Sequence, residues 1–241
     1  MIRRPLALLA GVVVAATLLA GCASGGSAPA PTPTPSAPSS ASAAGDVAAA
    51  WLDGGSMIAL LTWGSSSCKP MATDAAYADG TLKVALSDPA TDQPCTRDLV
   101  MRGIPVVLPD GVDPSQDLTI VVTGDGYSGE AVLAGVAGLV PGGGLDTGAT
   151  SAGWTGEDGT FAILTWGSSS CPPQIGSAVL AKGTITVTEA DPPADRICTL
   201  DLGPRVTVVT VPGVESGASY DLVWTASGTS AETIPIAGVA A

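Results

Sequence analysis

Apolar and polar residues alternate in short runs along this chain from about residue 46 onward, and turn-forming residues separate the runs. Thr184–Thr188 alternates strictly, and Leu82, Val84 and Leu86 alternate with polar or small neighbours. A period of two places every second side chain on the same face of a strand, so one face is expected to be buried. No long segment shows the period of an amphipathic helix. The pattern therefore predicts an all-β protein.

Two segments depart from this alternation because they are apolar almost throughout, namely Met57–Trp63 and Thr160–Trp166. Each follows a Gly-containing segment that predicts a hairpin turn, Trp51–Gly55 and Trp154–Gly159. A short apolar strand of this kind is expected at the centre of a sheet that is covered on both faces. Pro105 lies in another predicted strand and favours an edge or a bulge there, because proline cannot donate to the ladder.

The chain repeats itself at an offset of 103 residues. The eight residues Leu61–Cys68 recur unchanged as Leu164–Cys171. The same offset relates Trp51 to Trp154, Asp88-Pro89 to Asp191-Pro192, Cys95-Thr96 to Cys198-Thr199, and Asp98-Leu99 to Asp201-Leu202. We therefore expect a duplication, with repeat 1 at residues 46–140, a Gly-rich linker at 141–149 and repeat 2 at 150–241.

Six or seven short strands in each repeat match the size of an immunoglobulin-like β-sandwich. Two tandem domains of this kind are the expected architecture. The alternative is a single larger sandwich or barrel to which each repeat contributes one half.

The N-terminus has the features of an export signal. Arg3 and Arg4 precede the apolar run Leu6–Gly21, which is shorter than the roughly 20 residues of a membrane-spanning helix. Residues 1–21 are therefore predicted to be a signal peptide. Residues 22–45 consist almost entirely of Ala, Pro, Ser, Thr and Gly after Cys22, and predict a disordered, extended spacer.

The signal ends in Leu19-Ala20-Gly21-Cys22, which resembles the lipobox of bacterial lipoproteins. The resemblance implies that Cys22 is the lipidated first residue of the mature, exported protein, at the outer face of the cell membrane. With the spacer and the repeated Trp-Gly-Ser-Ser-Ser-Cys unit, the chain resembles secreted lipoproteins of high-GC Gram-positive bacteria that have no assigned function. The resemblance implies no activity.

Charge and cysteine content limit the classes of partner that the protein can bind and indicate the compartment in which it folds. The formal net charge is −13, and no basic patch is available for phosphates, which argues against nucleic-acid binding. Attachment to the membrane is expected through the lipid alone. The other cysteines, an even number in an exported chain, predict two disulfides, and the duplication favours a bridge within each repeat. These cysteines are Cys68, Cys95, Cys171 and Cys198.

The chain contains no histidine, which excludes Ser-His-Asp and Cys-His catalysis. Ser66–Lys69 matches the S-x-x-K signature of penicillin-binding enzymes, but Pro172 replaces the lysine in repeat 2. The serine triplets are better explained as groups that hydrogen-bond loop backbone beside a disulfide. We therefore predict no catalytic residue and no cofactor.

Carboxylates and tryptophans remain as candidate binding groups. Pairs of aspartates lie near each second cysteine, and Asp-Pro is typical of turns, with calcium binding as the second interpretation. These are Asp88 and Asp92 in repeat 1, and Asp191 and Asp195 in repeat 2. Trp63 and Trp166 are expected to pack in a core that is poor in aromatic residues, with exposed sugar-binding platforms as the alternative.

These features favour a non-enzymatic module of the cell envelope that binds a cell-wall component or an envelope protein, or that has a structural role. A hydrolase using carboxylates or serine is the first alternative. An inhibitor or accessory subunit of an envelope protease or transporter is the second.

Overall fold

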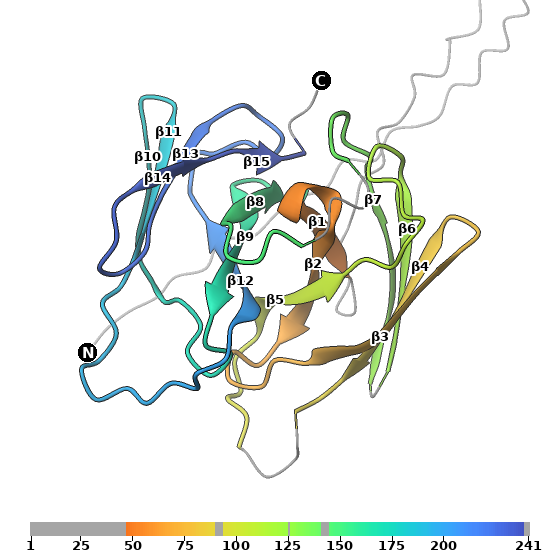
Figure 1. The fold of residues 1–241 in the computed structure, drawn as a ribbon, viewed down its shortest axis with the longest axis horizontal. Helices are drawn as coiled ribbons and strands as arrows, with labels where there is room; N and C mark the ends of the chain where they lie inside the picture. Colours follow the sequence, from red (N-terminus) through yellow and green to blue (C-terminus); the bar gives the residue numbers. More distant parts are fainter. Residues whose placement is uncertain (1–46, 90–93, 125, 141–144, 239–241) are drawn as a thin grey trace, which may run out of the picture. The chain divides into compact units, whose positions relative to one another are not determined.

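The structure is a computed structural model that describes residues 47–89, 94–124, 126–140 and 145–238 (Figure 1). The predicted signal peptide and spacer, Cys22, Asp92 and linker residues 141–144 lie outside the described residues. The described chain is all-β, as predicted.

Repeat 1 forms two sheets. The first inner sheet has the order β1-β2-β5, and the first outer sheet has the order β3-β4-β6-β7. The strands are β1 (Ala48–Leu52), β2 (Met57–Gly64), β3 (Met71–Ala78), β4 (Thr81–Ser87), β5 (Val100–Val107), β6 (Leu118–Gly124) and β7 (Tyr127–Leu133), with a 3-10 turn η1 (Asp53–Gly55) after β1. The predicted hairpin joins β1 to β2, and Pro105 lies on the edge strand β5.

Repeat 2 repeats this plan. The second inner sheet has the order β12-β9-β8-β15, and the second outer sheet has the order β10-β11-β13-β14. The strands are β8 (Ser151–Trp154), β9 (Thr160–Gly167), β10 (Ile175–Ala181), β11 (Thr184–Glu189), β12 (Gly203–Thr210), β13 (Asp221–Thr225), β14 (Glu232–Ile234) and β15 (Ile236–Ala237).

Each repeat has a hydrophobic core between its inner and outer sheets. In repeat 1, Trp51 and Ile58 from the inner sheet pack with Leu82 and Ile120 from the outer sheet. In repeat 2, Phe161 and Trp224 belong to the corresponding core. The alternation seen in the sequence of β4 and β11 follows from this, because only one face of each outer sheet is covered.

The prediction of immunoglobulin-like sheets is wrong, because one pair of strands in each outer sheet is parallel. Immunoglobulin sheets are antiparallel, whereas β4 pairs parallel with β6, and β11 pairs parallel with β13. A parallel pair needs a crossover connection. Here the chain crosses to the inner sheet as β5 or β12 and then returns to the outer sheet, so the next strand enters in the same direction.

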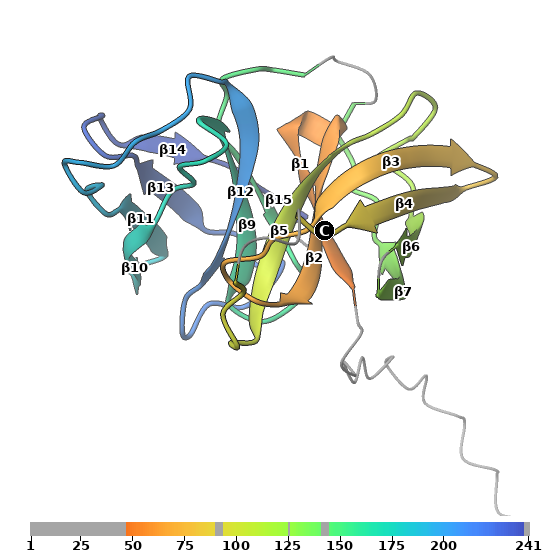
Figure 2. The ribbon, with the colours of Figure 1, turned by 90° about the horizontal axis from the view of Figure 1, so that it is seen from below.

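A third core joins the two inner sheets. Leu52, Met57 and Leu61 of repeat 1 pack with Leu164 and Val206 of repeat 2. Figure 2 shows β5 and β12 side by side along this junction, and the contacts between these strands agree. The strands β2 and β9 are thus covered on both faces, as their sequence predicted, and the second cover is the other repeat.

The two repeats approach closely enough that glycine is required at the junction. A Cβ atom added to Gly153 on β8 would lie 2.1 Å from the backbone oxygen of Trp51 on β1. The backbone N–H of Asp53 also donates to the Ser151 hydroxyl, at 2.9 Å. The repeats therefore form one packed unit through their inner sheets.

Candidate functional site

The two predicted disulfides are present. Cys68 is bonded to Cys95 and Cys171 to Cys198, and each pair is separated by 27 residues in sequence. In both repeats the first cysteine follows the central inner strand, β2 or β9, and the second precedes the next inner strand in the chain, β5 or β12. Each disulfide therefore holds the long excursion through β3 and β4, or β10 and β11, close to the inner sheet.

The serine triplets form a hydrogen-bonded network with the segment after the second cysteine. In repeat 1, the backbone N–H of Thr96 donates to the Ser67 hydroxyl at 2.9 Å, and that of Ser66 donates to Asp98 at 3.1 Å. The Thr96 hydroxyl also donates to Asp98. The same bonds recur in repeat 2 with Ser170, Thr199 and Asp201. The predicted structural role of the triplets agrees with this arrangement.

These hydrogen bonds stabilise the ionised carboxylates. Bonds from Ser66 and Thr96 lower the pKa of Asp98 to about 2. Bonds from Thr199 and Ser169 lower the pKa of Asp201 to about 2. Both groups are therefore charged at neutral pH and have no proton to donate.

Two arginines lie behind the networks, and our sequence analysis did not identify them. Arg102 on β5 is 4% exposed, and it donates to the carbonyl oxygens of Cys68 (2.6 Å) and Trp63 (3.2 Å). Arg205 on β12 donates to those of Cys171 (2.9 Å) and Trp166 (3.0 Å). Each guanidinium thus ties the end of the central inner strand to its disulfide.

A signal for these arginines does exist in the sequence. Arg102 and Arg205 are related by the offset of 103, and no other basic residue of the chain recurs at that offset. The glycine that ends each central strand makes room for the guanidinium. An added Cβ would lie 2.5 Å from the Arg102 Cζ at Gly64, and 2.8 Å from the Arg205 Cζ at Gly167.

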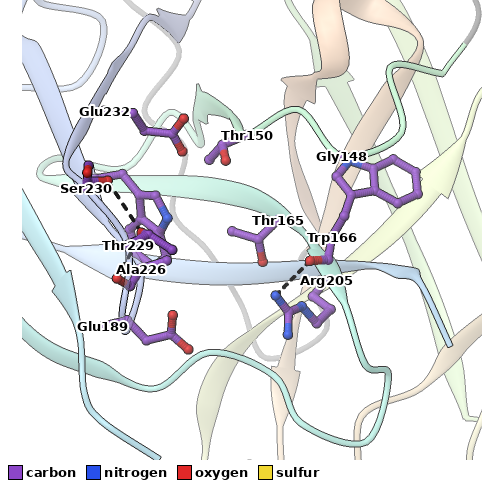
Figure 3. Close-up of a pocket in the computed structure, with 11 residues that line it drawn as sticks. Gly148, Thr150, Thr165, Trp166, Glu189, Arg205, Ala226, Thr229, Ser230 and Glu232 are labelled. Atoms are coloured by element: carbon purple, nitrogen blue, oxygen red, sulfur yellow. Dashed lines mark hydrogen bonds between the residues drawn. The ribbon is translucent and has the colours of Figure 1, made fainter. Parts of the chain in front are cut away.

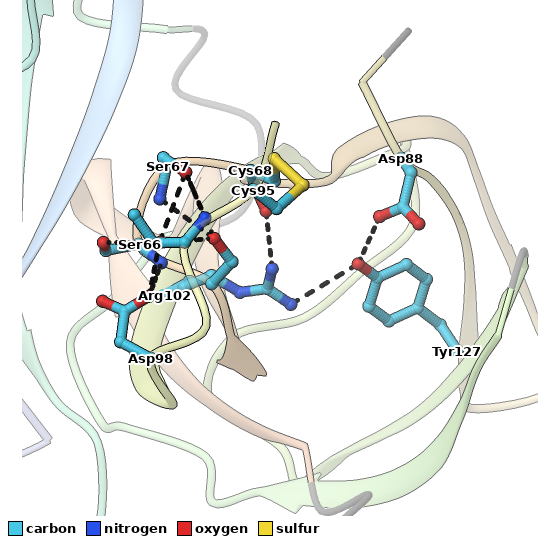
Figure 4. Close-up of a disulfide and its surroundings, with 10 residues drawn as sticks. Ser66, Ser67, Cys68, Asp88, Cys95, Asp98, Arg102 and Tyr127 are labelled. Atoms are coloured by element: carbon cyan, nitrogen blue, oxygen red, sulfur yellow. Dashed lines mark hydrogen bonds between the residues drawn. A yellow bond between two sulfur atoms is a disulfide. The ribbon is translucent and has the colours of Figure 1, made fainter. Parts of the chain in front are cut away.

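The space beyond the guanidinium differs between the repeats. In repeat 1, Tyr127 on β7 fills it (Figure 4). Its hydroxyl accepts from Arg102 Nη2 at 3.4 Å and donates to Asp88 at 2.5 Å. Burial and the hydrogen bond to Asp88 raise the pKa of Tyr127. The hydroxyl is therefore protonated at neutral pH and can act as that donor.

In repeat 2 the corresponding position is Ser230. Ser230 follows Tyr127 at the repeat offset of 103 residues, and it lies just before β14 as Tyr127 lies at the start of β7. The smaller side chain leaves a pocket of about 290 Å³ (Figure 3). In repeat 2 an open site thus lies beside Arg205.

The pocket lies between the inner and outer sheets and is polar. Thr165 and Arg205 line it from the inner sheet, and Glu189, Trp224 and Glu232 line it from the outer sheet. Burial lowers the pKa of Arg205, and the nearby negative charge of Glu189 opposes that effect. One cation and two carboxylates therefore face the same space.

Three buried polar atoms of residues that line this pocket have no partner among the described residues, namely Thr165 Oγ1, Trp166 Nε1 and Arg205 Nε. Thr165 is 6% exposed, and its Oγ1 atom has no hydrogen-bond partner among the described residues. The equivalent hydroxyl in repeat 1, that of Thr62, accepts from Arg102 Nη2 at 3.2 Å. The indole N–H of Trp166, which also lines the pocket, is likewise unpartnered within the described part of the chain.

The aspartates singled out in the sequence do not assemble a metal site among the described residues. Asp88 accepts from Tyr127, and Asp191 accepts from the Ser227 hydroxyl at 2.8 Å. Asp195 is exposed. Within the described ranges, no group of three or more Asp, Glu, Cys or His side chains is placed to hold a metal ion.

The five tryptophans differ in how deeply they are buried. Trp51, Trp154 and Trp224 are buried, but Trp63 is 41% exposed and Trp166 is half-buried. The prediction that Trp63 packs in the core is therefore wrong. Trp63 lies at the end of β2, beyond the part of the strand that the outer sheet and the other repeat cover.

Comparison with known proteins gives no relative. No protein-family model, no curated protein and no solved structure matches this chain. Among the described residues, no helix has the length and apolar character needed to cross a membrane.

Proposed function

We propose that this protein is a lipid-anchored, non-enzymatic binding module of the cell envelope. Cys22 is the lipidated residue, residues 23–45 are the tether, and the pocket around Arg205 is the ligand site. In this role the protein links the membrane to a cell-wall component or to another envelope protein. The lipobox supports the anchor, and the geometry of repeat 2 supports the binding site.

The single observation that favours binding is the unpartnered hydroxyl of Thr165. A buried polar group without a hydrogen bond costs about 1–3 kcal/mol, and nearly all such groups in proteins are satisfied. Thr62, its counterpart, is satisfied within the protein. A ligand in the pocket would supply the missing partner to Thr165.

The chemistry of the remaining polar groups supports a non-enzymatic role. In both repeats an aspartate accepts a hydrogen bond from a threonine hydroxyl, but a carboxylate with a pKa of about 2 is a weak base. Asp98 and Asp201, with pKa values lowered to about 2, cannot serve as general acids near neutral pH.

The anchor is tested by Cys22→Ser in a bacterial host that processes lipoproteins. We expect the wild-type protein in the membrane fraction, with a mass that includes acyl chains, and the variant in the soluble or secreted fraction. An unacylated wild-type protein would refute the anchor.

The binding role is tested with the detergent-solubilised full chain and insoluble cell-wall material. We expect capture by the wild type and loss of capture in Arg205→Met and Thr165→Val. Arg97→Met is the control, because Arg97 is exposed and this substitution removes the same charge at a different place. Equal capture by all four proteins would contradict the assignment of the site.

A further inference from the structure

We infer that the pocket of repeat 2 binds one neutral sugar ring, and that Tyr127 occupies the corresponding site of repeat 1. This inference rests on the proposed binding function and names the ligand class. Four features lead to it: the contacts of Tyr127, the size of the pocket, its polar lining and its charge.

Tyr127 shows what kind of group fits beside the arginine. It presents a six-membered ring whose hydroxyl accepts from a guanidinium and donates to a carboxylate. In repeat 2, the guanidinium of Arg205 and the carboxylate of Glu189 line the open pocket. A ring hydroxyl of a ligand can make the same pair of hydrogen bonds there, accepting from Arg205 and donating to Glu189.

The volume of the pocket limits the ligand to one ring. Drug-sized ligands occupy pockets of roughly 300–1,000 Å³, and this pocket is about 290 Å³. A single sugar residue, either free or at the end of a chain, is of the right size. A longer segment of glycan would have to remain outside.

The lining favours a sugar over the phenol ring of a partner's tyrosine. Besides Arg205 and the two glutamates, the hydroxyls of Thr150, Thr165 and Thr229 line the pocket. A phenol has one polar group and can pair with fewer of these side chains than a sugar can. A sugar carries hydroxyls around its rim, each both donor and acceptor, and can therefore pair with several of these groups.

The charge of the pocket selects a neutral sugar. By formal charge, Glu189 and Glu232 together outweigh Arg205 by one negative charge. A ligand carboxylate or phosphate would meet this excess of like charge. Neutral hydroxyls, in contrast, can donate to both carboxylates.

The experiment is isothermal titration calorimetry on the full chain in detergent. The probes are methyl glycosides of glucose, galactose, mannose and N-acetylglucosamine, with methyl glucuronide as the acidic probe and N-acetyltyrosinamide as the phenol. We expect at least one neutral glycoside to bind with one site per chain. The acidic and phenolic probes should bind at least tenfold more weakly.

Two variants and one matched control locate the binding. Thr165→Val should lower the affinity for the neutral glycoside at least tenfold. Thr62→Val, the same change in repeat 1, should leave this affinity unchanged. Ser230→Tyr introduces the side chain that closes repeat 1 and should abolish binding. Circular dichroism and melting temperature establish that each variant is folded.

The outcomes separate this inference from the proposed function. If cell-wall capture depends on Arg205 but no neutral glycoside binds, the sugar assignment is overturned and the binding module stands. Preferential binding of the phenol or of the glucuronide also overturns it. If neither cell-wall material nor any probe binds, the inference and the proposed function fail together.

Discussion

At the scale of single residues, one arginine in each repeat holds the end of the central strand, and the surroundings of the two arginines differ at one position. That position is Tyr127 in repeat 1 and Ser230 in repeat 2. Arg102 and Arg205 make the same two bonds to backbone carbonyls around a disulfide. Tyr127 completes the surroundings of Arg102, whereas Ser230 leaves Arg205 beside an open pocket. Arg102 therefore has a structural role in repeat 1, whereas its half-buried counterpart Arg205 is available for a ligand in repeat 2.

Arg102→Met should destabilise the protein more than Arg205→Met. Both changes remove the donors to two carbonyl oxygens, but Arg102 is also bonded to Thr62 and Tyr127 and is 4% exposed. We expect Arg102→Met to lower the free energy of unfolding by about 2–4 kcal/mol, and Arg205→Met to lower it by less. Urea unfolding followed by tryptophan fluorescence measures both, and an equal or inverted order would contradict the contrast between the repeats.

Acid should remove a contribution to stability that depends on Asp98 and Asp201. Their folded pKa of about 2 lies below the usual unfolded value of about 3.9, so the ionised groups favour the folded state above about pH 4. This contribution declines as the pH falls from about 4 to about 2. The melting temperatures of the wild type and of Asp98→Asn/Asp201→Asn should differ at pH 6 and converge near pH 2. A difference that does not change with pH would exclude these groups as its source.

At the scale of strands and loops, local pattern identified most elements but not their pairing. The apolar segments that became β2 and β9, both hairpins, the edge position of Pro105 and both disulfides could be predicted from local sequence. The parallel pairs β4–β6 and β11–β13 could not, because they depend on the crossover through another sheet. The pocket was also beyond local pattern, since it depends on how side chains from the inner and outer sheets meet around Arg205.

Removing the second disulfide should destabilise repeat 2 without abolishing its fold. The Cys171–Cys198 bond closes a loop of 27 residues in sequence separation, for which chain entropy gives roughly 3.5 kcal/mol. The double variant Cys171→Ala/Cys198→Ala should lose about 2–4 kcal/mol in urea unfolding. Its counterpart Cys68→Ala/Cys95→Ala serves as the comparison, and no loss in either would mean that the bridges do not restrain the unfolded chain.

At the scale of the whole described unit, the two repeats are joined by a core of their own. The sequence indicated a strand covered on both faces, but it could not show that repeat 2 supplies the cover for repeat 1. Leu52, Met57 and Leu61 pack directly with Leu164 and Val206. The duplication thus produced a pair of sheets that bury each other's outward faces.

Gly153→Ala tests this junction. The added Cβ would lie 2.1 Å from the Trp51 backbone oxygen, so the inner sheets must move apart, at a cost of about 1–3 kcal/mol. The control is Gly203→Ala, where the nearest atom to an added Cβ is 3.6 Å away. Thermal unfolding should show a lower melting temperature for Gly153→Ala alone; equal behaviour of the two variants would argue against the close contact of the repeats.

The most direct test of the central claim, that repeat 2 holds the open binding site and repeat 1 a closed one, is a map of amide chemical shifts. The isotopically labelled full chain would be titrated with solubilised cell-wall glycan. We expect shifts confined to residues around Arg205, including Thr165, Glu189 and Trp224, with the signals around Arg102 and Tyr127 unchanged. Matching shifts in both repeats, or shifts around Arg102 alone, would contradict it.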